Sequence, residues 1–402
     1  MSKRILIVSR YFWPDKTPES KILYTLAFYL KKKGHIVDVL SSQPSYRKNY
    51  ENLKRPYKEI DKGVKIFRIN LSNEIGKIFL FRIINSIKLS LKTIYLSLIN
   101  RYEIIIATSN PPVIGPFSAA TSALLINSRF IYYCMDITPE VGLVSKDFSN
   151  PYLYNLLQII DGASCLLANP LIVHSSDMKN TILKRSFGKK CAFEILNNFS
   201  PKSKSKVILD KTFFSKNDNK KLSLIYAGNI GRFQSLEGVI EEMSKIKNYK
   251  NIELTIMGEG FEKENLIKLN NKRKANVKFI PYQNSEVAKN IISQADIGLI
   301  SLSKNVYKYS YPSKTMTYLE LGKPIIAIVE KEAQLANDIN EGNFGYVVSD
   351  NIKNSLADLL IYLAENQEEI YLKSVNALKI YEKLYSEEVI LKKWESIIDK
   401  WN

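Results

Sequence analysis

Residues 311–324 read Tyr-Pro-Ser-Lys-Thr-Met-Thr-Tyr-Leu-Glu-Leu-Gly-Lys-Pro and run directly into the apolar segment Ile325–Val329. Pro312 suits the first turn of a helix, where a missing backbone N–H costs nothing. Gly322 can adopt the left-handed conformation that ends a helix, and Pro324 prevents the helix from continuing. We therefore predict a loop, a helix, a turn and a buried strand, as in a doubly wound α/β sheet.

The start of this predicted helix offers backbone N–H groups at Ser313 and Lys314 that no helical carbonyl accepts. They lie at the positive end of the helix dipole, where a phosphate binds well. A helix followed by a strand also occurs in any α/β sheet. The pattern alone therefore indicates the fold more strongly than the ligand.

The pattern P-S-K-x-x-x-Y-L-x-x-G-K-P-I-I-A resembles the donor-diphosphate segment of the family-four glycosyltransferases, which are retaining enzymes of the GT-B fold. Within that family it is similar to the branch that builds bacterial O-antigens and capsules, including N-acetylfucosaminyltransferases. The resemblance implies an α/β protein with two Rossmann-like domains that face a cleft and a C-terminal helix that crosses back to the first domain. It also implies that Pro312, Ser313 and Lys314 bind the donor diphosphate and that Lys314 assists catalysis.

One departure from the family pattern concerns the donor ribose. The wider family carries two glutamates at positions that correspond here to Tyr309 and Thr317. The second of these glutamates usually holds the ribose. Glu320, one helical turn beyond Thr317, is a candidate substitute, so the resemblance places both Thr317 and Glu320 among the donor-binding residues.

The composition limits the choice of class and compartment. A chain of 402 residues with 45% apolar content is long enough for two domains with separate cores. Its three cysteines have no paired spacing, which favours a reduced, cytoplasmic protein. The two histidines are far apart and no D-x-D occurs, so we expect no metal site and no essential cofactor. A strand follows Met1 at once, and we therefore expect no signal peptide.

The net charge of +18 is concentrated near the N-terminus. Residues 1–100 hold 20 Lys and Arg against 7 Asp and Glu, a difference of +13. Such a field favours an anionic partner, namely a membrane surface, a phospholipid-linked substrate or nucleic acid. Nucleic acid is the weaker choice, because no basic and aromatic binding motif is found. The alternative is a lysine-rich genome, which the Asn, Ile and Lys usage also indicates.

The first half, residues 1–199, reads as a Rossmann-like acceptor domain. A strand at Arg4–Ser9, a helix at about Ser20–Lys33 and a strand at His35–Leu40 form the opening unit of a doubly wound sheet. Its segments Y-F-W-P-D and K-K-G-H-I-V-D-V-L-S resemble the first unit of the family. A later strand ends in Asp136-Ile137-Thr138-Pro139-Glu140. In the O-antigen branch this D-x-x-P-E element occupies the cleft, which makes Asp136 and Glu140 catalytic candidates on the acceptor side.

The segment Ile75–Ile99 carries an aliphatic stripe at helical spacing and no acidic residue. Its stripe consists of Leu80, Ile84, Ile87, Leu91, Ile94 and Leu98. Lys77, Lys88 and Lys92 lie on another face, and they make the segment too charged to span a bilayer. One reading is a helix that covers the sheet with its stripe in the core. The other, which we favour, is a helix pair that also lies on the membrane.

The second half begins after a Lys-, Ser- and Asn-rich linker at residues 200–221, and residues 222–379 read as the donor domain. The sequence Y-A-G-N-I-G-R-F-Q-S-L-E resembles the donor-phosphate loop of the O-antigen branch. It implies that Gly228, Asn229, Gly231 and Arg232 bind the donor and that Arg232 also stabilises the leaving group. Backbone near Tyr282 receives the nucleotide base in relatives. Residues 380–402 are expected to form the helix that packs back on the first domain.

We therefore expect a retaining, metal-independent glycosyltransferase in bacterial surface polysaccharide synthesis. It would move a sugar, preferably an N-acetylated amino sugar, from a nucleotide diphosphate donor (a UDP-sugar is favoured) to a lipid-linked oligosaccharide. It would work in the cytoplasm on the anionic inner face of the inner membrane, without a nucleic acid partner. Two alternatives remain open: a nucleotide-sugar epimerase of similar fold, and a basic, non-enzymatic protein that binds membranes or nucleic acid.

Overall fold

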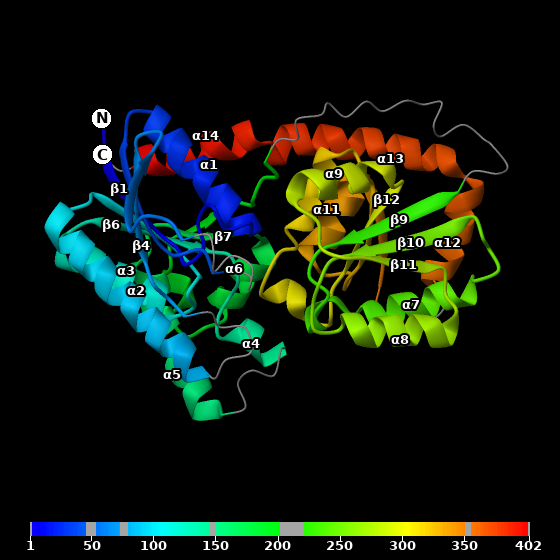
Figure 1. Ribbon diagram of the computed structural model, residues 1–402, viewed down its shortest axis with the longest axis horizontal. Helices are drawn as coiled ribbons and strands as arrows, with labels where there is room; N and C mark the ends of the chain where they lie inside the picture. The colour runs from blue at the N-terminus through cyan, green and yellow to red at the C-terminus, as the bar shows by residue number, and fades with distance from the viewer. Residues whose placement is uncertain are drawn as a thin grey trace. The chain divides into compact units, whose positions relative to one another are not determined.

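The structure is a computed structural model that describes residues 2–45, 54–72, 79–144, 150–201, 221–349 and 355–400. It divides into two compact units (Figure 1). The N-terminal domain comprises Met1–Asn197, Tyr309–Tyr311 and Ile390–Asn402, and the C-terminal domain comprises Asn198–Lys308 and Pro312–Val389. Most of the predicted linker, residues 202–220, lies outside the described residues.

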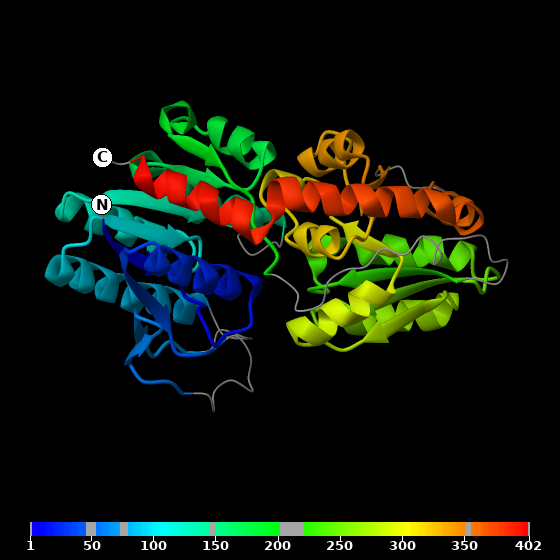
Figure 2. The ribbon, with the colours of Figure 1, turned by 90° about the horizontal axis from the view of Figure 1, so that it is seen from above.

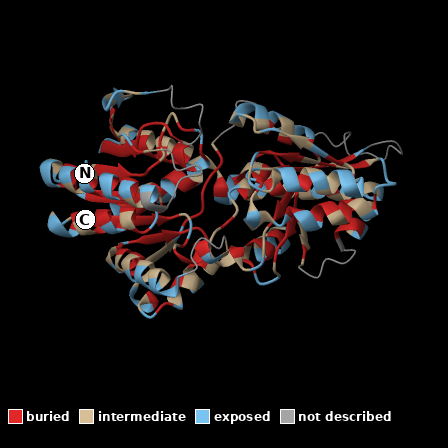
Figure 3. Ribbon diagram, turned by 60° about the horizontal axis from the view of Figure 1, so that its bottom comes forward, coloured by how far each residue is buried: buried red, intermediate tan, exposed pale blue. Residues whose placement is uncertain are grey.

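The N-terminal domain is built on a sheet with the strand order β3-β4-β2-β1-β5-β6-β7-β8. All its neighbours are parallel except β3 and β4. Its strands are β1 (Arg4–Val8), β2 (Ile36–Ser42), β3 (Lys58–Asp61), β4 (Val64–Ile69), β5 (Ile104–Thr108), β6 (Arg129–Cys134), β7 (Leu171–Val173) and β8 (Phe193–Ile195). The central strands are buried on both faces, so they read as continuous apolar runs (Figure 3). The sequence did not predict β3 and β8, which are short edge strands.

Helices cover both faces of this sheet, and the first shows how they begin. They are α1 (Pro18–Lys32), α2 (Phe79–Asn100), α3 (Ile114–Leu125), α4 (Glu140–Val144), α5 (Pro151–Leu167) and α6 (Ser176–Leu183). α1 starts two residues before its predicted start at Ser20, because the Thr17 side chain accepts the Ser20 N–H and Pro18 stands at the first helical position. Gly34, with φ of +94°, follows its last turn.

The C-terminal domain has a fully parallel sheet with the order β11-β10-β9-β12-β13-β14. Its strands are β9 (Leu222–Ala227), β10 (Ile252–Met257), β11 (Val277–Ile280), β12 (Ile297–Ser301), β13 (Ile325–Ile328) and β14 (Gly345–Val348). The strand order reverses between β9 and β12. Open α/β sheets bind their ligands at such a reversal, beyond the carboxyl ends of the strands.

The helices of the C-terminal domain include the one predicted from the opening segment. They are α7 (Leu236–Lys245), α8 (Lys263–Arg273), α9 (Ser285–Gln294), α10 (Lys314–Glu320), α11 (Gln334–Gly342), α12 (Ser355–Glu365) and α13 (Gln367–Ile380). α10 begins at Lys314, so Pro312 precedes the helix rather than opening it. Its end is as predicted, since Gly322 has φ of +63° and its N–H donates to the Leu319 carbonyl.

The last helix, α14 (Glu387–Asp399), packs on the N-terminal domain (Figure 2). Trp394 is fully buried and meets the Tyr133 ring edge-on, with 5.0 Å between ring centroids. Lys3 donates to the Ile398 carbonyl at 3.1 Å, and Arg129 donates to the Ile397 carbonyl at 2.6 Å. The predicted return of the C-terminal helix to the first domain is confirmed.

This packing makes Trp394 a stability determinant of the N-terminal domain. We expect Trp394→Ala to lower the free energy of unfolding by about 3–5 kcal/mol, because it leaves a large cavity against Tyr133. Denaturant titration would measure the change. The control is Leu372→Ala on α13, whose side chain is exposed and should cost less than about 0.5 kcal/mol. Equal midpoints for the Trp394 variant and the wild type would contradict this role.

Candidate active site

The turn after β9 approaches the neighbouring turn after β10 backbone to backbone. Gly228 has φ of +152° and Gly258 has φ of +155°, values that side chains rarely tolerate. A Cβ atom on Gly258 would lie 1.9 Å from the Gly228 carbonyl oxygen, so only glycine fits there. The Gly228 N–H donates to Met257 and the Gly258 N–H donates to Ile280, at 2.9 and 3.0 Å. These bonds hold the ends of β9, β10 and β11 together, while Gly228 remains exposed.

Lys314 reaches the same turn from the first residue of α10. Its Nζ donates to the Tyr226 hydroxyl at 2.8 Å and lies 3.9 Å from the centroid of the Tyr226 ring. A Cβ on Gly228 would be 3.1 Å from this nitrogen, so the ammonium is next to the turn. Burial lowers the pKa of Lys314 to about 7. A crowded ammonium that bonds a neutral hydroxyl rather than a carboxylate is well suited to an anion.

Tyr318 fastens the base of the turn, a role that the sequence analysis missed. Its hydroxyl oxygen accepts the Ala227 N–H at 2.9 Å and lies 3.2 Å from the Ile225 carbonyl and 3.3 Å from the Leu299 carbonyl. β9 and β12 pair only at Leu224 and Ile225, and the hydroxyl bridges them beyond that point. A Cβ on Gly298 would lie 2.5 Å from the Tyr318 ring, so this glycine makes room for it.

Arg232 lies on the outer side of the glycine turn. Its guanidinium is 4.5 Å from the Phe261 ring centroid, and its Nε is 3.7 Å from the Glu262 carboxylate. About half of its side-chain surface is exposed. Asn229 and Gly231 belong to the same turn, and the Asn229 carbonyl accepts the Tyr226 hydroxyl at 2.5 Å. The structure thus brings Gly228, Asn229, Gly231 and Lys314 together, with Arg232 facing the following turn.

The remaining predicted donor residues have other partners. Glu320 is buried and accepts Lys289 Nζ and Ser200 Oγ, at 2.5 and 2.6 Å. Thr317 is 3.3 Å from the same Ser200 hydroxyl. The Tyr282 N–H donates to Glu259 at 3.3 Å, beside the turn after β10. Pro312 and Ser313 precede α10, and Ser313 is exposed. Their contacts with a donor stay predictions.

Two acidic side chains lie at the carboxyl end of the N-terminal sheet. Asp136 follows β6 and forms an antiparallel bridge with Ser310, just before α10 in sequence. Its side chain reaches solvent, yet the surrounding protein removes enough hydration to raise the pKa to about 6. Glu19, in the first turn of α1, is buried and accepts Ser9 Oγ at 2.7 Å and Asn110 Nδ2 at 2.6 Å. Burial, with a smaller contribution from Asp136, raises the pKa of Glu19.

The sequence did not indicate Glu19, which lies in the first turn of α1. A glutamate at that position commonly stabilises the helix through its dipole and has no further role. Its first-turn position after the loop that follows β1 is the signal that could have found it. In doubly wound sheets that loop lies at the ligand-binding edge.

Glu140, the other acceptor candidate, belongs to a buried ion-pair cluster. Arg185 donates to both of its oxygens, at 2.9 and 2.6 Å, and to Asp161 at 2.7 Å. Gln158 also donates to Glu140 at 2.8 Å. This cluster ties α4 to α5 and to the segment after α6. Both Glu140 oxygens therefore already accept hydrogen bonds. These bonds fix the position of the Asp136–Glu140 segment.

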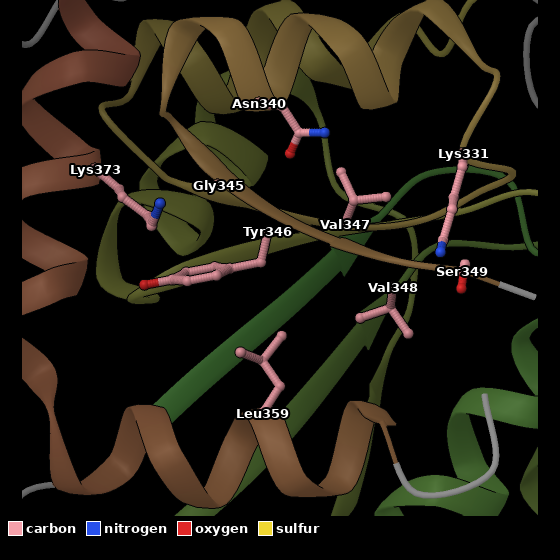
Figure 4. Close-up of a pocket in the computed structure, with 9 residues that line it drawn as sticks. All are labelled: Lys331, Asn340, Gly345, Tyr346, Val347, Val348, Ser349, Leu359 and Lys373. Carbon is pink, nitrogen blue, oxygen red and sulfur yellow. The ribbon is translucent and has the colours of Figure 1, made fainter. Parts of the chain in front are cut away.

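A pocket of about 600 Å³ opens elsewhere in the C-terminal domain, at the edge strand β14 (Figure 4). Its lining consists of Lys331, Asn340, Gly345, Tyr346, Val347, Val348, Ser349, Leu359 and Lys373. None of the predicted site residues lines it. Lys373 Nζ lies 4.4 Å from the centroid of the Tyr346 ring and donates to Asn343, so the protein itself occupies that aromatic face.

Solved structures show that this architecture is the GT-B fold. A sucrose-phosphate synthase from Thermosynechococcus elongatus superposes with a TM-score of 0.74 over 99% of this chain and 98% of its own, at 13% identity. HepE of Anabaena in complex with UDP-glucose superposes with a TM-score of 0.68 over 99% and 100%, at 12% identity. The predicted fold is therefore confirmed.

The sequence comparisons find similarity to glycosyltransferases. Residues 209–381 match the Glycosyl transferases group 1 family. The chain is 22% identical to the probable glycosyltransferase WbjE of Pseudomonas aeruginosa over 314 residues, 74% of each chain. It is 30% identical to the putative colanic acid biosynthesis glycosyl transferase WcaI of Escherichia coli over 119 residues, 29% of each. The family match lies in the C-terminal domain, and the predicted resemblance to the family-four glycosyltransferases is confirmed.

The pKa of Lys314 gives nucleotide binding a testable pH dependence. Because this pKa is lowered to about 7, Lys314 is mostly charged below pH 7. At a pH above 7 it must take up a proton when a diphosphate binds. We expect the affinity for UDP to fall about fivefold between pH 7 and pH 8, because the charged fraction of Lys314 falls from about a half to about a tenth. Titration calorimetry in buffers of different ionisation enthalpy would measure both the affinity and the proton uptake.

Two variants make this test specific for Lys314. Lys314→Met should bind UDP weakly with no such pH dependence. Lys314→Arg keeps its charge throughout the range and should also show a flat profile. An unchanged wild-type affinity from pH 7 to pH 9 would rule out the lysine as the diphosphate ligand.

Proposed function

We propose that this protein is a retaining glycosyltransferase of bacterial O-antigen or capsule synthesis. It moves a sugar from a UDP-sugar to a lipid-linked oligosaccharide acceptor. The observation that carries the proposal is the Lys314 ammonium beside the exposed Gly228 turn, at the strand reversal of the C-terminal sheet. The similarity to the glycosyltransferases WbjE and WcaI, and the UDP-glucose bound to HepE, support the same function. The resemblance to the O-antigen branch leads us to propose that the transferred sugar is an N-acetylated amino sugar.

The chemistry of the proposed reaction centres on the leaving diphosphate. When the bond between the sugar and the phosphate breaks, negative charge collects on the phosphate oxygens. Lys314 and Arg232 stabilise this charge. Charged groups that are already in position in a partly water-excluded site need not rearrange when the transition state forms. The acceptor oxygen bonds to the anomeric carbon on the face that the phosphate leaves, and its proton passes to a phosphate oxygen. No enzymic nucleophile takes part in this proposed step. Exposed backbone at Gly228 and Asn229 allows the diphosphate to approach closely.

The acceptor half of the proposal rests on the N-terminal domain. Asp136 has its pKa raised to about 6, so it can accept a hydrogen bond from a sugar hydroxyl near neutral pH. Glu19 lies close enough to Asp136 for their charges to interact. Glu140 is a positioning residue, because its bonds to Arg185 hold the segment that carries Asp136.

A panel of nucleotide sugars tests the activity and separates it from the two alternatives. Slow hydrolysis of the donor, followed as released nucleotide, should be fastest with a UDP-linked amino sugar. An epimerase would instead change the sugar without needing an acceptor. A non-enzymatic binding protein would consume nothing and would show no affinity for UDP. Either result would overturn the proposal.

Arg232 can be tested in the same assay. Arg232→Ala should lower kcat by roughly a hundredfold, the effect of losing one charge-stabilising donor. Arg273→Ala is the matched control, because Arg273 is about equally exposed in the same domain and pairs with Glu241 on α7. Unchanged turnover in the Arg232 variant would remove this residue from the site.

Metal dependence supplies a further test. In the part of the chain that the structure describes, no group of three or more His, Cys, Asp and Glu side chains could hold a metal ion. We expect EDTA to leave the transfer rate unchanged. A loss of activity that manganese or magnesium restores would contradict a metal-independent mechanism.

The proposed place of work is the cytoplasmic face of the inner membrane, where lipid-linked acceptors and nucleotide sugars meet. Cys134, Cys165 and Cys191 are unpaired, as a reducing compartment requires. Among the described residues, no helix is both long and apolar enough to cross a bilayer. Contact with the lipid would therefore use a surface of the folded protein.

A further inference from the structure

Helix α2 turns its predicted aliphatic stripe away from the protein, while Leu89 and Leu96 are buried in the core. The face that packs on the domain includes polar side chains, and the buried ones are Asn85, Ser86, Ser90, Thr93 and Ser97. The predicted aliphatic stripe faces outward, and its exposed members are Ile84, Ile87, Leu91 and Leu98. The reading of this stripe as core is therefore wrong. Helices of a water-exposed protein normally show the opposite orientation, with the apolar stripe inward.

The two helices beside α2 continue the same surface. α3 packs against α2 on one side and α5 on the other, as Figure 1 also shows. α3 turns small residues such as Ala119 and Ala120 inward and exposes Phe117, Leu124 and Leu125. α5 buries Asp161, Gly162 and Ser164 but exposes Tyr152, Leu156, Ile159 and Leu166. Exposed apolar surface on three adjacent helices exceeds the scattered residues of an ordinary surface.

The charges on this surface are of one sign. α2 carries Arg82, Lys88 and Lys92 and has no acidic residue, and α3 has no charged residue. The acidic residue of α5 is Asp161, which is buried against Arg185. The Lys92 ammonium lies 4.5 Å from the centroid of the Tyr95 ring, in an arrangement suited to a membrane interface. Apolar side chains flanked by basic residues complement a bilayer of anionic lipids.

We propose that the outer faces of α2, α3 and α5 form a membrane-insertion face, whose apolar side chains enter the lipid while Arg82, Lys88 and Lys92 contact the headgroups. A second copy of the chain fits this face less well. A two-fold interface would place its basic residues against their own copies with no acidic partner on the three helices. The inference deepens the proposed function, since a lipid-linked acceptor has to be met at the bilayer.

Apolar insertion and surface charge contribute differently, and this difference is measurable. Exposed charges are screened over ~10 Å at 0.1 M salt, whereas inserted side chains are not. The predicted contribution of Lys77 lies outside the described residues. Binding to anionic vesicles should therefore weaken but persist at high salt, and part of it should remain on neutral vesicles.

Vesicle flotation tests the insertion face directly. Wild-type protein should float with phosphatidylglycerol-containing vesicles at low and high salt. Leu91→Glu combined with Leu124→Glu should lower partitioning by roughly a hundredfold or more, because two inserted leucines are lost. Both positions are more than 60% exposed, so the fold does not depend on them. The control is Leu372→Glu on α13, which is 62% exposed in the C-terminal domain and should float like the wild type.

Three further measurements decide the outcome. Leu124→Trp should show fluorescence that brominated lipid quenches, which reports depth rather than surface attachment. Equal flotation of the wild type and the Leu91/Leu124 variant would overturn the proposal. A wild-type dimer in gel filtration that this variant dissociates would also overturn it, in favour of a second copy. UDP binding by calorimetry should be the same in all variants, so a failure of the insertion face and a failure of the proposed activity give different results.

Discussion

The candidate active site of this protein depends on one steric constraint, the contact of the Gly228 carbonyl with Gly258. A side chain at Gly258 would lie 1.9 Å from that oxygen, so the two turns can meet only as bare backbone. This contact fixes the position of the exposed turn after β9. Tyr318 then fastens the turn from below, and Lys314 reaches it from the side. A phosphate would thus meet a backbone and a cation whose positions are already set, which is what electrostatic stabilisation of a leaving group requires.

Much of this arrangement could be predicted from the sequence. β1 and β13 were predicted to within one residue, because strands buried on both faces read as short apolar runs. Gly322 ends α10 as expected for a residue without a side chain. The prediction failed where the local signal is weak. β3 is short and carries charged residues, and α10 starts later than Pro312 suggested.

The site was harder to predict, because its partners are distant in sequence. Glu19 bonds Asn110, and Glu140 bonds Arg185, pairs that are separated by 91 and 45 residues. No spacing rule links such residues. The orientation of α2 could not be settled from its pattern either, since an aliphatic stripe at helical spacing fits a core and a bilayer equally well. The exposure of Ile84, Ile87 and Leu91 excludes the core reading.

The return of α14 has a consequence for how the chain can be divided. Its Ile398 carbonyl accepts Lys3, so the two ends of the described chain lie side by side (Figure 1). Residues 1–197 alone lack Trp394 and would expose the Tyr133 ring that it covers. A circular permutation that places residues 387–400 before residue 2, through a short glycine linker, would restore this cover in one continuous chain that lacks only Tyr309–Tyr311 of the N-terminal domain. The N-terminal domain could then be studied without the C-terminal domain.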